Sequence, residues 1–93
     1  MARYLEERVR AEPNLELLAP ARLNIVCFRY RGSDALNANL VIALQESGIA
    51  APSTTTVDGH LAIRAAFVNH RTQKRDVDAM VAAVLRLGET VPA

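Results

Sequence analysis

A two-residue turn signal constrains the fold of this chain more than any other feature. Asp58-Gly59 separates the threonine-rich stretch STTTV (53–57) from HLAIRAAFV (60–68), in which apolar residues alternate with others. Asp-Gly favours the type I′ turn, whose two central residues have a positive φ, and this turn joins neighbouring antiparallel strands. Residues 53–68 are therefore predicted to form a β-hairpin, and the chain to contain an antiparallel sheet.

Two more strands are predicted ahead of the hairpin. Residues 23–30, LNIVCFRY, are rich in residues with high β-propensity, and a brief strand over 15–18 precedes the interruption at Pro20. One face of the 23–30 strand carries Leu23, Ile25 and Cys27, and the other carries Val26, Phe28 and Tyr30. Because both faces are apolar, we expect this strand to be covered on two sides.

Helical spacing is found in three segments. Residues 2–12 carry Leu5 and Val9 on one face. A second helix is predicted to begin with Asp34 or Asn37 as its cap and to end at Gly48. A third is predicted to begin at Thr72 as its N-cap and to extend to Gly88. The apolar stripes of the second and third are Leu36, Leu40, Val41 and Leu44, and Val77, Met80, Val81, Val84 and Leu85.

The order of these elements, α, β, β, α, β, β, α, predicts the fold class. We expect an α+β fold, with a small, mainly antiparallel sheet and helices packed on one of its faces. With 93 residues the chain has material for one core, so residues 1–93 are expected to form a single domain. Within it, 1–12 is interpreted as a linking helix, 15–88 as the core and 89–93 as a tail. Hydrophobic residues at 51% and charged residues at 23% exclude a disordered chain.

Charge and cysteine content argue against several classes of function. The net charge is +1 without a basic cluster, which argues against nucleic acid as a partner. No apolar run is as long as a membrane span. Cys27 is the only cysteine, so it lacks a second thiol for a disulfide or a metal pair, and we expect a cytoplasmic protein in a reducing compartment. No complete catalytic set and no glycine-rich nucleotide loop is present.

Arg64 is the residue that points to binding. On the second hairpin strand Leu61, Ile63, Ala65 and Phe67 share one face, which leaves Arg64 between Ala62 and Ala66 on the other. A bidentate donor rising from a flat strip suits a carboxylate or a phosphate, although a solvated charge is the ordinary alternative. We expect Val26, Phe28 and Tyr30 on the same open face, so that a second domain, a second subunit or a small molecule must cover it.

The two histidines and the cysteine are weaker candidates for a functional site than Arg64. His70 lies in the loop after the arginine strand, where it either shares the rim of that site or caps the next helix. His60 follows the turn and is interpreted as a solvated residue. Cys27 is interpreted as a small buried hydrophobe rather than a nucleophile. We therefore assign no catalytic residue, no metal ligand and no cofactor ligand to this chain.

Several stretches taken together resemble a known family. LNIVCFRYRGS (23–33), Leu36-Asn37, LQESG (44–48), LAIR (61–64) and NHRT (69–72) resemble, in this order, the C-terminal region of group II pyridoxal-phosphate-dependent decarboxylases. That group includes the aromatic-amino-acid, histidine, glutamate and diaminobutyrate decarboxylases. The similarity runs from about residue 15 to residue 88, which is most of the chain.

The resemblance implies a small domain of a fold type I enzyme. Such a domain packs on a large domain that binds pyridoxal phosphate through a lysine, and the complete enzyme is expected to be a homodimer. The only lysine here, Lys74, lies between Gln73 and Arg75 without the family's lysine motif, so the chain alone is expected to bind no cofactor. Arg64 matches the arginine that reaches toward the substrate carboxylate in glutamate-decarboxylase-like members, and His70 follows it in a loop that varies.

Three hypotheses follow. In the first, the chain is a detached C-terminal domain of an amino-acid decarboxylase that supplies a docking face and Arg64 to a site built elsewhere. In the second, it is a stand-alone α+β module that binds a small anion or self-associates through the same face. A cysteine-dependent enzyme that uses Cys27 is a third, remote alternative.

Overall fold

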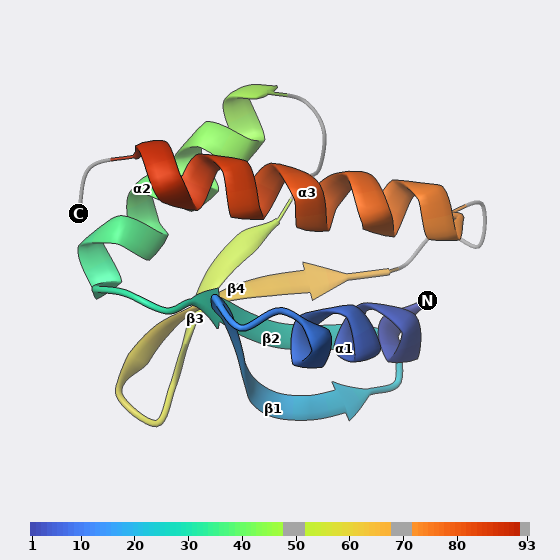
Figure 1. Cartoon of the computed structure of the whole chain (residues 1–93). Helices are drawn as coiled ribbons and strands as arrows, with labels where there is room; N and C mark the ends of the chain where they lie inside the picture. Colours follow the sequence, from blue (N-terminus) through green and yellow to red (C-terminus); the bar gives the residue numbers. More distant parts are fainter. Residues whose placement is uncertain (48–51, 68–71, 92–93) are drawn as a thin grey trace.

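The computed structural model describes residues 1–47, 52–67 and 72–91, in the predicted order α, β, β, α, β, β, α (Figure 1). This confirms the α+β class. The elements are α1 (Ala2–Ala11), β1 (Leu15–Arg22), β2 (Ile25–Tyr30), α2 (Asp34–Ser47), β3 (Ser53–Val57), β4 (His60–Ala66) and α3 (Lys74–Thr90). None of the helices in the described ranges is long and apolar enough to cross a membrane.

The four strands form one antiparallel sheet in the order β1-β2-β4-β3. The hairpin is confirmed: Asp58 and Gly59 have φ angles of 51° and 81°, as a type I′ turn requires, and β3 pairs with β4 without a register shift from Ser53–Arg64 to Val57–His60. The predicted end of the second hairpin strand, residue 68, lies outside the described residues.

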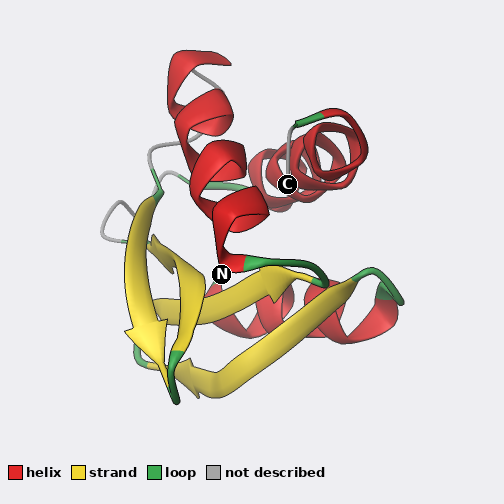
Figure 2. Cartoon of the chain, turned by 90° about the vertical axis from the view of Figure 1, so that its left-hand side faces the viewer, coloured by secondary structure: helices red, strands yellow, loops and turns green. Residues whose placement is uncertain are grey.

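One face of the sheet carries the core. Phe28 of β2 lies opposite Ile63 of β4, and Val26 lies opposite Ala65, so these four residues share a face. They join one buried cluster with Leu5 and Val9 of α1, Leu40 and Leu44 of α2, and Val77, Val81 and Val84 of α3. Both α2 and α3 lie above the sheet (Figure 1), and Figure 2 shows the strong twist of the strands beneath them. The helices therefore pack on one face, as predicted.

The expectation that Val26, Phe28 and Tyr30 lie on the open face is wrong. Val26 and Phe28 are fully buried, and the ring of Tyr30 packs against Gly88 of α3. The antiparallel register places directly opposed residues on the same face, and Phe28 opposes a core residue. The alternation along β2 was correct, but the assignment of its two faces was inverted.

Several predicted ends also differ. β1 continues through Pro20 to Arg22, because an edge strand with register shifts tolerates a residue without an N–H. β2 begins at Ile25 rather than Leu23, which has a φ of 52° in the connecting turn and is 99% exposed. α3 extends to Thr90, so part of the expected tail is helical.

The helix caps were predicted at the wrong residues. The hydroxyl of Ser33, rather than Asp34 or Asn37, accepts the N–H of Leu36 at the start of α2. At the start of α3 the N-cap is Gln73 rather than Thr72, and it forms a reciprocal capping box with Asp76. The predicted cap Gly48 lies outside the described residues.

Asn37 is instead a buried polar residue that ties α2 to β2. Its side-chain oxygen accepts the N–H of Tyr30 at 2.9 Å, and its amide donates to the carbonyls of Tyr30 and Ser33 at 3.0 Å each. The side chain thereby satisfies both backbone groups at the end of β2, as a neighbouring strand would. Gly88 also contacts Tyr30 rather than ending a helix. It lies inside α3, where a Cβ would collide with the ring of Tyr30.

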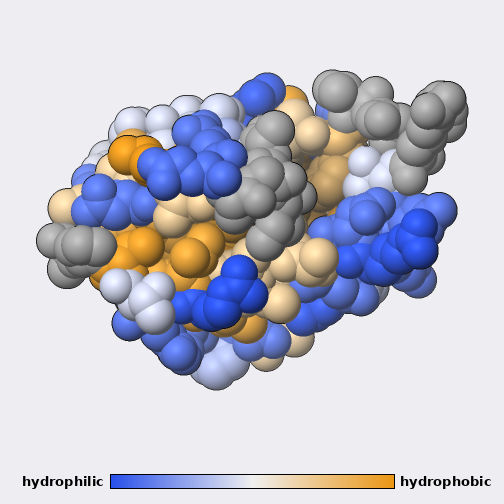
Figure 3. All heavy atoms as spheres, turned by 90° about the horizontal axis from the view of Figure 1, so that it is seen from above, coloured by the Kyte–Doolittle hydropathy of each residue, from blue (hydrophilic) through white to orange (hydrophobic). Residues whose placement is uncertain are grey.

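The outer surface of the helical layer is mixed. Viewed from above (Figure 3), apolar surface lies exposed among polar side chains. Among the described residues the large hydrophobic side chains with the highest exposure are Met1 at 43%, Ile42 at 52% and Leu23 at 99%. Of these three, Ile42 is the one that projects from α2.

Candidate anion-binding site on the open sheet face

The sheet has a second face that is not part of the helix-packed core. We call it the open face; on β2 and β4 it carries Ile25, Cys27, Arg29, Ala62, Arg64 and Ala66. Arg64 lies at its centre, because β4 is an inner strand and Arg64 is paired with Cys27 on one side and Ser53 on the other. Sequence reasoning placed Arg64 on this face correctly.

Arg64 is half-buried, and no described residue forms a hydrogen bond or an ion pair with it. Its neighbours along β4 on this face are Ala62, which is fully buried, and Ala66, which is exposed. Both alanines have short apolar side chains, so neither offers the guanidinium a hydrogen-bond acceptor. A planar group with parallel N–H donors in this setting is suited to bind a carboxylate or a phosphate.

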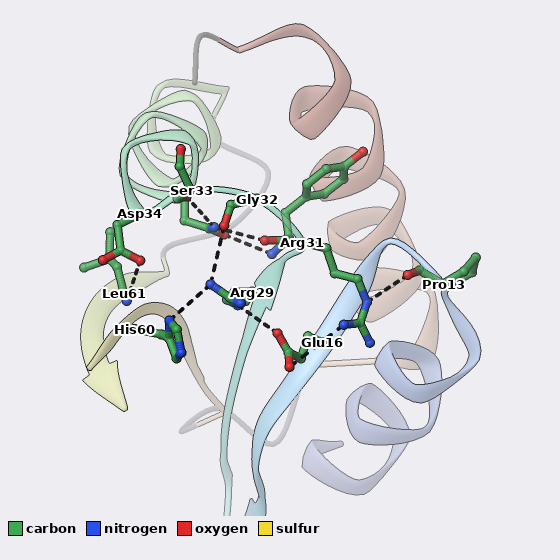
Figure 4. A network of polar contacts seen from close by, with 11 residues as sticks. Pro13, Glu16, Arg29, Arg31, Gly32, Ser33, Asp34, His60 and Leu61 are labelled. Carbon is green, nitrogen blue, oxygen red and sulfur yellow. Dashed lines mark hydrogen bonds and ion pairs between the residues drawn. The ribbon is translucent and has the colours of Figure 1, made fainter. Parts of the chain in front are cut away.

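Arg29, on the same face, differs from Arg64 because its side chain is bound by several partners. Its Nε lies 2.9 Å from Oε1 of Glu16, and its side chain is only 17% exposed. Its terminal nitrogen lies 3.4 Å from the carbonyl of Gly32 and 3.5 Å from Nδ1 of His60. Figure 4 shows this network at the end of the sheet, where Arg31 also approaches Glu16 and donates to the carbonyl of Pro13.

The network neutralises much of the charge of Arg29. The hydrogen bond from Arg29 holds the pKa of Glu16 below its ordinary value, and the charges of Arg29 and Arg31 act in the same direction. Glu16 is therefore ionised at neutral pH and serves as counter-ion to Arg29. Arg64 has no comparable partner among the described residues, so of the two arginines that β2 and β4 carry on the open face it is the one with free donors.

The other residues considered as site candidates from the sequence are Cys27, His60 and His70. Cys27 is half-buried on the open face, directly across from Arg64. His60 is exposed, as predicted, but it belongs to the network around Arg29 rather than standing alone. His70 lies outside the described residues, so its place relative to Arg64 stays a prediction.

The network of Glu16 and Arg29 was not identified from the sequence. A signal for it exists: the two residues have opposite charges, lie on neighbouring strands, and become directly opposed once β1 and β2 pair. The alternation along β2 also places Arg29 on the face of Cys27. Without the register of the first hairpin, however, its partner was not visible.

The open face carries no lysine that could hold pyridoxal phosphate. A lysine beside the cofactor is required to hold it, and the single lysine, Lys74, is exposed at the start of α3, with its Nζ 5.1 Å from the centre of the Tyr4 ring. This position is on α3, not on the open face. Within the described ranges, no group of three or more His, Cys, Asp or Glu side chains is arranged to hold a metal ion.

No family model matches the chain. It is 30% identical over 77 residues to histidine decarboxylase of Mus musculus, and 31% identical over 87 residues to tryptophan decarboxylase TDC1 of Camptotheca acuminata. The chain is similar to one part of the group II pyridoxal-phosphate-dependent decarboxylases. The alignments cover 83% and 85% of this chain but only 12% and 17% of those decarboxylases.

A solved structure of another decarboxylase has the same fold over nearly the whole chain. It is the glutamate decarboxylase domain of diaminobutyrate-pyruvate transaminase and L-2,4-diaminobutyrate decarboxylase from Vibrio parahaemolyticus, with a TM-score of 0.85 and 26% identity. The superposition covers 94% of this chain and 20% of that one. The chain thus spans about a fifth of a decarboxylase, and the resemblance seen in the sequence is confirmed.

Proposed function

We propose that the chain is the C-terminal small domain of a pyridoxal-phosphate-dependent amino-acid decarboxylase, and that it docks through its open face onto a larger domain that binds the cofactor. In this role Arg64 binds the carboxylate of the substrate. The observation that carries the proposal is the half-buried residue Arg64, whose guanidinium has no counter-charge among the described residues. Such a group is suited to an anion that arrives from outside the domain.

Docking strengthens this interaction. When a second domain covers the open face, water is displaced and the effective dielectric constant around Arg64 falls, so its attraction for a carboxylate increases. Arg29 does not compete for the same anion, because Glu16 already holds it at 2.9 Å. On β2 and β4 the open face therefore offers an anion-binding position at Arg64 beside apolar or small side chains, which can pack against the larger domain.

The larger domain supplies what this chain lacks. We infer that it carries the lysine and the pyridoxal phosphate, that this chain alone has no activity, and that the complete enzyme is a cytoplasmic lyase of amino-acid metabolism. This is consistent with the position of Lys74 on α3. The pure chain, mixed with pyridoxal phosphate, is expected to give no absorbance band of a lysine adduct.

The docking step is testable with Cys27 as a reporter, since it is half-buried on the open face opposite Arg64. The chain is grafted in place of the corresponding segment of the Vibrio decarboxylase domain, and the alkylation rate of Cys27 is compared with that of the isolated chain. We expect the rate to fall at least about tenfold on grafting, since docking buries the thiol. Equal rates would contradict docking through this face.

A matched control locates the effect. In a Cys27→Ser background, Ala82→Cys places a thiol on the exposed side of α3. Its alkylation rate should be unchanged by grafting. If grafting protected the thiol at position 82 but left the alkylation rate of Cys27 in the wild-type chain unchanged, the interface would lie on the helical side. That result would refute the proposal.

A further inference from the structure

The sheet ends in two edge strands, β1 and β3, that differ in how they are protected. β1 contains Pro20 and has register shifts against β2, and Oε2 of Glu6 in α1 accepts the N–H of Ala21 at 2.6 Å. A proline, an irregular register and a covering side chain are the devices by which proteins block a free sheet edge. The edge of β1 is thus closed.

Among the described residues, none of these devices protects β3. Its sequence is Ser-Thr-Thr-Thr-Val, with no charge and no proline, and its register against β4 is unbroken over all five residues. Ser53, Thr54 and Thr56 are exposed, and no described residue outside the hairpin bonds to the backbone of this strand. β-branched residues on a regular uncharged edge form a template for another strand.

The turn type determines which backbone groups are free. In a hairpin with a two-residue turn, the residues that flank the turn, Val57 and His60, form a hydrogen-bonded pair. Bonded and non-bonded pairs then alternate, so Ser53, Thr55 and Val57 direct their N–H and C=O groups toward β4. The corresponding groups of Thr54 and Thr56 point outward, which gives the edge two donors and two acceptors.

An exposed apolar side chain lies on the side of α2 that faces the hairpin. Asp34, Ala38, Ile42 and Gln45 follow one another on one side of α2, since they are spaced by four, four and three residues. The two polar members bond to the hairpin: Asp34 accepts the N–H of Leu61 at 3.1 Å, and Gln45 donates to the carbonyl of Pro52 at 2.9 Å. This side of α2 therefore faces the hairpin, and Ile42 is 52% exposed on it.

We propose that β3 pairs with β3 of a second copy of this chain, antiparallel and about a twofold axis through Thr55. In this register Thr54 of each copy exchanges hydrogen bonds with Thr56 of the other, so all four outward groups are satisfied. An axis at Thr54 would set Thr56 against Pro52, which has no N–H, and an axis at Thr56 would set Thr54 against Asp58 in the turn. Thr55 is thus the centre that the sequence favours.

A second copy suits this edge for two reasons. The pairing opposes only Ser, Thr and Val with one another, so no like charges meet. The twofold axis also brings Ile42 of both copies to the same side of the joined sheet, above the new seam. The open face and Arg64 remain free, so this inference does not depend on the proposed function. With four backbone hydrogen bonds, we expect a dissociation constant of roughly 0.1–1 mM.

Sedimentation of the chain over a concentration series that brackets this range tests the proposal. The wild-type mass should rise from monomer to dimer. Thr56→Pro should remain monomeric while its circular dichroism is unchanged, because it removes an outward N–H and no bond to β4. Thr56→Ala, the matched control, should dimerise, whereas Ile42→Lys should weaken dimerisation at least fivefold. A wild-type chain that stays monomeric, or one whose association is abolished by Arg64→Ala instead, overturns the proposal.

Disulfide trapping tests the register itself and does not depend on how Thr56→Pro folds. In a Cys27→Ser background, Thr55→Cys places two thiols across the axis as a non-hydrogen-bonded pair, with Cα atoms about 4.5 Å apart, which a disulfide can bridge. Residue 54 of one copy lies opposite residue 56 of the other. Two cysteines introduced by Thr54→Cys are therefore too far apart to form a disulfide. Under mild oxidation only Thr55→Cys should form a covalent dimer. Equal trapping of the two variants would rule out this register.

Discussion

Arg64 of β4 lies directly opposite Cys27 of β2, on the face of the sheet that lies outside the helix-packed core. Arg29, two residues further along β2 on the same face, is bound to Glu16, whereas Arg64 has no partner among the described residues. One of these arginines thus serves the structure of the domain. The other is available for binding.

Arg64→Met in the isolated chain tests this distinction. Because a half-buried charge without a partner adds little to stability, we expect the free energy of unfolding to stay the same or to rise by about 0.5 kcal/mol. Urea denaturation measures it. A loss of more than about 1 kcal/mol would mean that Arg64 has a structural role.

Asn37→Ala should be strongly destabilising. Asn37 is fully buried and satisfies both the N–H and the carbonyl of Tyr30, which would lose their partners together. We expect a loss of about 2–3 kcal/mol in the free energy of unfolding by urea denaturation. The exposed Asn14 provides the control, since Asn14→Ala should change it by less than about 0.5 kcal/mol. Similar values for the two variants would contradict the anchoring role of Asn37.

Gly88→Ala reverses the usual effect of this substitution in a helix. Alanine normally stabilises a helix interior by about 0.5–1 kcal/mol relative to glycine. Here the added Cβ would collide with the ring of Tyr30, so we expect a loss of about 1–3 kcal/mol in thermal or urea unfolding. In a Tyr30→Leu background the loss should shrink, since the ring is gone. An unchanged loss would place its cause elsewhere.

These last two residues show where sequence reasoning ended. The hairpin was predictable because the φ angles of Asp58 and Gly59 are a local property of the two residues. Asn37 and Gly88 were interpreted as helix ends, because asparagine and glycine favour ends unless a distant residue gives them another role. In both cases that residue is Tyr30.

The faces of β2 show the same limit. Alternation along the strand was visible, but which side faces the helices depends on its pairing with β4, more than thirty residues away. Arg64 was placed correctly because its own strand has a strongly apolar face and a face of alanines. β2 has apolar residues on both faces, so its pattern alone did not show which face packs against the helices.

Acid should weaken the contact between α1 and α3. The hydroxyl of Tyr4 donates to Asp78 at 2.6 Å, and this bond, together with Arg8, holds the pKa of Asp78 below its ordinary value of 3.8. A carboxyl whose pKa is lower in the folded state stabilises the fold above its unfolded pKa, and this contribution is lost as the pH falls through the folded value.

Asp78→Asn should therefore be less stable than wild type at pH 7, and the difference should diminish below about pH 4 as Asp78 of the wild type is protonated. Unfolding free energies measured between pH 7 and pH 2 provide the comparison. A difference that stays constant over this range would show that the charge of Asp78 is not its source.

Binding of the substrate carboxylate by Arg64, when the open face is docked, is the core of the proposed function. It is tested most directly by steady-state kinetics of a decarboxylase that carries this chain as its grafted small domain, with Arg64→Ala compared against Arg75→Ala, an exposed arginine of α3. We predict that Arg64→Ala raises KM at least about tenfold without loss of folding, and that Arg75→Ala leaves KM unchanged. Unchanged KM and kcat in Arg64→Ala would contradict the account.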